Sequence, residues 1–122
     1  MSKEIDDELY PQWVTLKFHE NEGFREFQID RKSLISRESS ILSKYFLEDK
    51  EAKIKLSKWI KKESDHEFYV RRSAVLCKYL LNILKGQKTY VPNHHIPKFE
   101  EESKLFGIQL TKHIEGDETL YS

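Results

Sequence analysis

Two stretches near the start of the chain alternate between hydrophobic and polar residues. In WVTLKF at 13–18 the even-numbered residues are the apolar set, and in FREFQID at 24–30 Phe27 and Ile29 take that role. An alternation of period two is typical of a strand that is buried on one side. The intervening HENEG is rich in residues that favour turns, so the sequence predicts a β-hairpin.

The hydrophobic period then changes to that of a helix. SLIS at 33–36 predicts a single helical turn, and SSILSKYFLED at 39–49 predicts a short helix behind serines that can cap it. The strongest pattern is AVLCKYLLNILK at 74–85, which is apolar around most of its circumference. We expect Ser73 to cap its start and Gly86 to end it in the left-handed conformation.

Short extended segments lie between and after these helices. AKIKLSKWI at 52–60 alternates through Ile54 and Leu56 and predicts a strand, as does EFYV at 67–70. TYVP predicts a further extended piece, and the following NHH predicts a loop.

A final helix is predicted to begin at Pro97 and to end at Gly107. Its glutamates, Glu100–Glu102, lie in the first turns, where acids favour the positive end of a helix. Consecutive helical residues are about 100° apart, so these side chains should fan out into solvent and not converge on a metal ion. Phe99 and Phe106 are expected to pack inward.

The chain of 122 residues fits one domain. We expect a flexible acidic N-terminal tail at 1–11, a folded domain at 12–110 and a C-terminal tail without a sustained pattern at 111–122. No apolar run approaches the length of a membrane span, and the start of the chain has acids where a secretory signal needs an apolar core. With Cys77 as the one cysteine, no intrachain disulfide can form, so an intracellular location, cytoplasmic or nuclear, is expected.

Charge and candidate chemistry both favour a protein without an active site. Lysine plus arginine equals aspartate plus glutamate at 21 each, which makes nucleic acid an unlikely main partner. The histidines at 94, 95 and 113 and Cys77 lack the spacing of a zinc or copper site, and Cys77 falls within a buried helix. None of the common catalytic or phosphate-binding motifs occurs. We expect no enzyme activity, no cofactor and no metal.

Taken in order, these segments resemble the BTB/POZ superfamily, in its potassium-channel tetramerisation (KCTD-like) branch. The resemblance extends over residues 13–108, from WVTLKF to LFGI. Its most specific parts are Leu81–Leu84 before Gly86, Pro92, Phe99–Glu102, and Phe106–Ile108. The chain is divergent, because KFHENEG stands where the family has N-V-G-G after the first strand, and Arg71-Arg72-Ser73 replaces D-R-x-P.

The resemblance implies an α+β fold, with a small mixed sheet of three to four strands, including the N-terminal hairpin, and about five flanking helices. It also implies a non-catalytic protein–protein interaction module that self-associates and acts as a scaffold or regulatory adaptor. Two alternatives stay open: an adaptor for a cullin-type ubiquitin ligase, and the assembly domain of a potassium channel or larger regulator. The oligomeric state is open between dimer, tetramer, pentamer and heterodimer.

The resemblance also suggests two sets of surface residues. Phe46, Leu47 and Glu48 match the apolar-x-acid motif with which cullin-binding members dock their scaffold, although Phe46 also suits a core position. Trp13, Arg71 and Arg72 are the candidate oligomer-interface residues.

Overall fold

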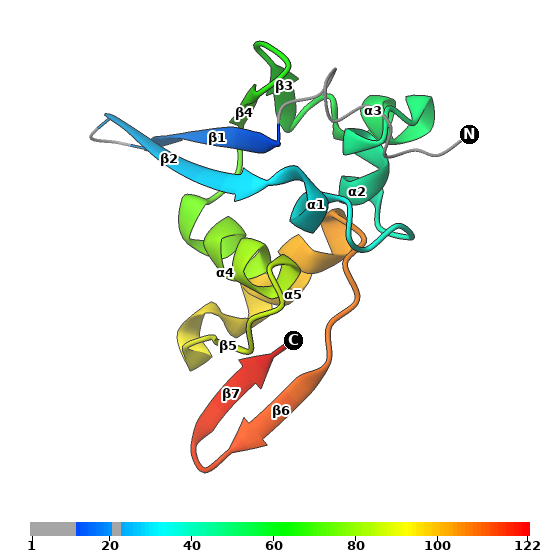
Figure 1. Cartoon of the computed structure of the whole chain (residues 1–122). Helices are drawn as coiled ribbons and strands as arrows, with labels where there is room; N and C mark the ends of the chain where they lie inside the picture. Colours follow the sequence, from blue (N-terminus) through cyan, green and yellow to red (C-terminus); the bar gives the residue numbers. More distant parts are fainter. Residues whose placement is uncertain (1–11, 21–22) are drawn as a thin grey trace.

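The computed structural model describes residues 12–20 and 23–122, and the predicted tail at 1–11 lies outside the described residues. The described chain is a mixed α+β fold with a four-stranded sheet, a smaller three-stranded sheet and five α-helices (Figure 1). Its elements in chain order are β1 (Trp13–Glu20), β2 (Gly23–Asp30), α1 (Arg31–Leu34), α2 (Ile41–Phe46), α3 (Lys50–Leu56), β3 (Ile60–Lys62), β4 (Glu67–Val70), α4 (Ala74–Leu84), β5 (Thr89–Tyr90), the 3₁₀ turn η1 (Asn93–His95), α5 (Ile96–Leu105), β6 (Lys112–Glu115) and β7 (Glu118–Tyr121).

The four-stranded sheet has the order β2-β1-β4-β3. β1 and β2 form the predicted hairpin, in which Val14 pairs with Ile29 and Leu16 with Phe27. β4 joins the other side of β1 in parallel, and β3 pairs with β4 in antiparallel fashion. The hairpin and the strand at 67–70 are therefore confirmed, and the sheet is mixed, as expected.

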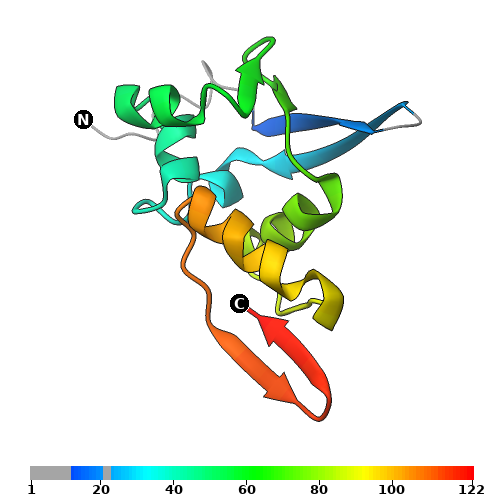
Figure 2. The same ribbon diagram turned by 180° about the vertical axis from the view of Figure 1, so that it is seen from behind.

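Helices cover one face of this sheet. α4 contacts β1 and β2, and α5 lies beside α4 on the side away from the sheet (Figures 1 and 2). Ser73 caps α4 as predicted, because its hydroxyl accepts a hydrogen bond from the Leu76 N–H, and Gly86 follows the helix with a φ of +88°. The core under the sheet is apolar and contains, from the strands, Val14, Leu16, Phe18, Ile29, Ile60, Phe68 and Val70.

The prediction of a strand at 52–60 is wrong for most of that stretch, which forms helix α3. The carboxylate of Asp49 accepts a hydrogen bond from the Ala52 N–H at 2.9 Å and starts the helix. Ala52 and Leu56, four residues apart, are buried, whereas Ile54 is 74% exposed. The apparent alternation arose because exposed Ile54 stands between the buried Ala52 and Leu56 with lysines in between, and only Ile60 at the end of the stretch belongs to a strand.

The stretch at 111–122, expected to be a C-terminal tail outside the folded domain, is instead folded. Residues 112–121 form a hairpin, β6–β7, which turns at Gly116 with a φ of +66°. β7 also pairs with β5, so the second sheet has the order β5-β7-β6 and lies at the end of the molecule far from the first sheet (Figure 1). Tyr121 anchors the hairpin, because its ring is buried against Phe99 of α5 with the ring centroids 5.0 Å apart.

In the part of the chain that the structure describes, no helix combines the length and the apolar character needed to cross a membrane.

Candidate functional site

The second face of the four-stranded sheet is not covered by any described helix (Figure 2). Because successive strand residues point to opposite faces, this face carries the positions between the core residues. We call it the open face, and its outward residues are Trp13, Thr15, Lys17, His19, Phe24, Glu26, Gln28, Lys61, Glu67 and Tyr69.

Aromatic side chains concentrate at one end of the open face. Phe24 contacts His19 and Tyr69 edge to face, with centroid separations of 5.1 and 5.8 Å. Phe24 is nevertheless 60% exposed, and Trp13 near the other end of β1 is 59% exposed. Large apolar side chains that gather on one surface mark a site of interaction better than isolated ones do.

A groove of about 810 Å³ lies beside this aromatic end. It runs from the open face to the loop that connects β4 with α4, and its walls mix aromatic rings with charges of both signs. The residues that line it are His19, Phe24, Lys61, Glu63, Tyr69, Val70, Arg71, Arg72 and Ser73. Such a surface can bind a polypeptide through rings and ion pairs.

The three residues predicted for an oligomer interface have different surroundings. Trp13 and Arg71 are exposed, the first on the open face and the second in the wall of the groove. Arg72 turns inward, where its Nε donates hydrogen bonds to Glu102 Oε1 at 2.9 Å and Oε2 at 3.1 Å. Its guanidinium also lies over the ring of Trp59, 4.4 Å from the centroid. Arg72 therefore joins the loop after β4 to α5 within one chain.

This ion pair corrects the prediction that all three glutamates of α5 are solvated. Glu101 is exposed, but Glu102 is 2% exposed. The hydrogen bonds donated to Glu102 raise the pKa of Arg72 above its already high usual value, so the arginine stays charged beside the buried carboxylate. The remaining glutamate, Glu100, accepts a hydrogen bond from the hydroxyl of Tyr121 at 2.7 Å.

The predicted docking motif lies at the end of α2. Phe46 is buried, and its ring packs against that of Phe68 with centroids 5.0 Å apart. Leu47 is half-buried, whereas Glu48 is exposed in the left-handed conformation, with a φ of +65°, and forms an ion pair with Lys53 at 2.8 Å. The motif therefore offers a partner its second and third residues, with Phe46 placed in the core.

Potential catalytic and metal-binding side chains are dispersed. Cys77 is buried in α4, and its burial raises the pKa of the thiol far above the usual range, so it is protonated at neutral pH. His94 and His95 stack with ring centroids 4.1 Å apart, and His95 Nδ1 lies 2.8 Å from the Tyr79 hydroxyl oxygen. His113 shares a hydrogen bond with Ser122 on the distant hairpin. Residues 12–20 and 23–122 contain no group of three metal-ligating side chains.

The sequence could have identified the open face more fully. Phe24 and Tyr69 stand one position out of phase with the apolar residues of β2 and β4, so each was assigned to a strand without being recognised as an exposed ring.

No protein-family model and no curated protein matches the chain. The open face and its groove are therefore the candidate site on the strength of their geometry and exposed side chains.

Proposed function

We propose that this chain is a non-catalytic protein–protein interaction module that self-associates through the open face and serves as a scaffold or regulatory adaptor. The observation that carries the proposal is the exposure of Trp13 and Phe24 on a sheet face that no described helix covers. Removing two such rings from water on association is favourable by about 25 cal/mol per Å² of apolar surface.

The charges of the open face suit a contact between two identical copies. An isologous interface requires a surface that is complementary to itself. The open face and its groove carry both cations and carboxylates: Lys17, Lys61, Arg71, Glu26, Glu63 and Glu67. Ion pairs can then form across a two-fold axis, and the formal net charge of zero opposes association little.

The arrangement of the chain supports a BTB/POZ fold of the potassium-channel tetramerisation type. That proposal draws on the hairpin, the small capped helices, the strand β4 parallel to β1 and the buried helix α4 followed by α5, which occur in the order of the motifs that carry the resemblance. The module then acts by its surfaces. The protonated, buried thiol of Cys77 is in keeping with this, because it cannot serve as a nucleophile.

The test is the mass in solution by light scattering at tens of micromolar protein. We expect the wild type to be larger than one chain and the double variant Trp13→Glu/Phe24→Glu to be a monomer, because two buried charges would face each other across the interface. The matched control is Ile54→Glu/Ile114→Glu, which places the same charges at two isoleucines that are 74% and 71% exposed elsewhere.

Two results would overturn the proposal. A monomeric wild type removes self-association altogether. A double variant that keeps the mass of the wild type removes the open face as the interface, even if the protein self-associates. The control variant should retain the mass of the wild type, and its melting curve by circular dichroism should match.

A cullin scaffold is a second proposal, supported by the exposed, left-handed Glu48 at the end of α2. In a pull-down from cell extract read by mass spectrometry, Glu48→Lys should lose the cullin while keeping its circular dichroism melt. Glu51→Lys, at an exposed position on α3, is the matched control. If the wild type retains no cullin, the second proposal fails and self-association is unaffected.

A further inference from the structure

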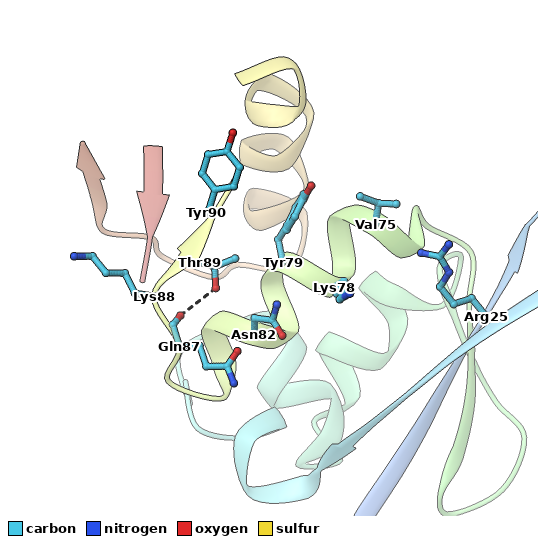
Figure 3. A pocket seen from close by; sticks show the side chains of 9 residues that line it. All are labelled: Arg25, Val75, Lys78, Tyr79, Asn82, Gln87, Lys88, Thr89 and Tyr90. Carbon is cyan, nitrogen blue, oxygen red and sulfur yellow. Dashed lines mark hydrogen bonds between the residues drawn. The ribbon is translucent and has the colours of Figure 1, made fainter. Parts of the chain in front are cut away.

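A second groove, of about 440 Å³, follows the outward flank of α4 between β2 and β5 (Figure 3). We call it the α4 groove, and its lining residues are Arg25, Val75, Lys78, Tyr79, Asn82, Gln87, Lys88, Thr89 and Tyr90. Arg25 lies at one end, and Tyr90 and Lys88 lie at the other, so the groove is elongated (Figure 3). It is separate from the open face, on which the proposed self-association depends.

The charges of the α4 groove have one sign. Arg25, Lys78 and Lys88 are cationic, and no carboxylate is among the described residues that line it. Lys88 forms an ion pair with Glu115 of β6, at the outer end. Lys78, in the middle, is exposed and has no ion-pair partner in the described part of the chain. A groove of this kind attracts an acidic ligand.

The uncharged groups of the α4 groove suit a polypeptide. The side-chain amides of Asn82 and Gln87 offer donors and acceptors to an extended backbone. Tyr79 and Tyr90 offer flat apolar surfaces, and Tyr79 is held in place by the hydrogen bond between its hydroxyl and His95. Rings, amides and cations along one open channel match an acidic segment with interspersed apolar side chains better than a compact small molecule.

The chain itself contains such a segment. Residues 1–10, MSKEIDDELY, have four acids at positions 4, 6, 7 and 8 and apolar side chains at 5, 9 and 10. They precede β1, and about eleven extended residues span up to roughly 36 Å. Arg25 pairs with Phe18, five residues from the start of β1, which corresponds to about 17 Å along the strand. The segment is therefore long enough to reach the level of Arg25, at one end of the α4 groove.

We propose that the α4 groove binds residues 1–10 of the same chain. The acids pair with Lys78 and its cationic neighbours, and the apolar side chains contact the two tyrosines. In this arrangement the N-terminal segment occupies the groove in competition with any acidic peptide of another protein. Self-association through the open face does not require this contact, so the two proposals can fail separately.

The first test uses the full chain and nuclear magnetic resonance. The side-chain amide signals of Asn82 and Gln87 report on the groove directly. We compare the wild type with the variant Glu4→Gln/Asp6→Asn/Asp7→Asn/Glu8→Gln and expect these two signals to shift. A control variant, Glu38→Gln/Glu51→Gln, neutralises exposed acids elsewhere and should leave them in place. Groove signals that do not respond to the N-terminal acids overturn the proposal.

The second test measures binding by fluorescence polarisation of a labelled synthetic peptide, MSKEIDDELY, to the acid-neutralised full chain, whose own segment no longer competes. Lys78→Glu in that protein should weaken binding about tenfold, because an attraction becomes a repulsion at the middle of the groove. Lys55→Glu, at an exposed position of α3, should have no effect. The proposal is overturned if Lys78→Glu binds the peptide as well as its parent, or if the neutral peptide MSKQINNQLY binds equally.

Discussion

The two faces of the four-stranded sheet are formed by the same strands but differ in the exposure and in the role of their side chains. The covered face contributes Val14, Leu16 and Phe18, which are at most 5% exposed. On the same strand, Trp13 and His19 point the other way and are exposed. A step of one residue along β1 therefore separates side chains that stabilise the fold from side chains that are available for binding.

The difference continues past the end of β4. Val70 points to the core, Arg71 lies in the wall of the open-face groove, and Arg72 turns back to reach Glu102. The loop keeps the alternation of the strand, so two adjacent arginines perform separate roles. Residue type alone does not distinguish them, but their phase relative to the strand does.

The largest expected effect comes from comparing one phenylalanine on each face of the sheet. Phe18→Ala should lower the free energy of unfolding by about 4 kcal/mol, because its fully buried ring leaves a cavity. Phe24→Ala should change it by less than about 0.5 kcal/mol, since that ring is 60% exposed. Urea denaturation at a protein concentration where the chain is monomeric measures both. Equal losses would show that the Phe24 ring is buried within the monomer and would contradict an open face.

The second test compares two neighbouring glutamates of α5. Glu102→Ala should lower the free energy of unfolding by about 3 kcal/mol, because it leaves the inward-turned Arg72 without its partner. Glu101→Ala, at an exposed position, should change it by less than about 0.5 kcal/mol. In a double-mutant cycle, Arg72→Ala combined with Glu102→Ala should cost clearly less than the sum of the single changes. Additive losses would show that the two side chains do not interact.

The smallest expected effect concerns Asp30. This residue pairs with Trp13 at the edge of the open face, and its side chain caps the start of α1. Partial burial raises the pKa of its carboxyl group, but the hydrogen bonds from the Ser33 hydroxyl at 2.8 Å and N–H at 3.0 Å outweigh this, so the pKa is lowered overall. Asp30→Ala should cost about 1 kcal/mol at pH 7.

The pH dependence of that cost has a definite sign. Because the folded pKa lies below the unfolded value of about 3.9, the contribution of the carboxylate is present above that value and is lost as the pH falls through the folded pKa. The difference between wild type and Asp30→Ala should therefore shrink in urea melts at strongly acidic pH. Asp30→Ser keeps a cap without a titrating group, and its difference from Asp30→Ala should stay constant with pH.

The elements that the sequence predicted well have signals confined to a few neighbouring residues. The hairpin followed from alternation around a turn, and α4 followed from an apolar periodicity between Ser73 and Gly86. The stretch around Ile54 and Leu56 was ambiguous, because alternating lysines imitate a strand while Asp49 starts a helix. Local patterns fail where two periods fit the same few residues.

The remaining features depend on partners that are distant in sequence. Glu102 is buried because Arg72 meets it from the loop after β4, and no pattern within α5 contains that information. The strand β7 is stable because Tyr121 packs on Phe99 and pairs with Thr89 of β5. The Gly116-Asp117 pair between Ile114 and Leu120 was the one local signal of that hairpin, and it was too short to stand out.

Gly107, just after α5, has a consequence for the order in which the parts of the chain fold. Its φ is +69°, and a Cβ added there would lie 2.9 Å from the backbone nitrogen of Ile41, while the Leu42 N–H donates to the Phe106 carbonyl oxygen at 3.0 Å. The end of α5 is thereby joined to the start of α2 across most of the described sequence. Closing so long a loop is slow, so we expect the hairpin and α4 to form early and this contact late. Gly107→Ala should then accelerate unfolding more than it slows folding, as measured by stopped-flow mixing with urea.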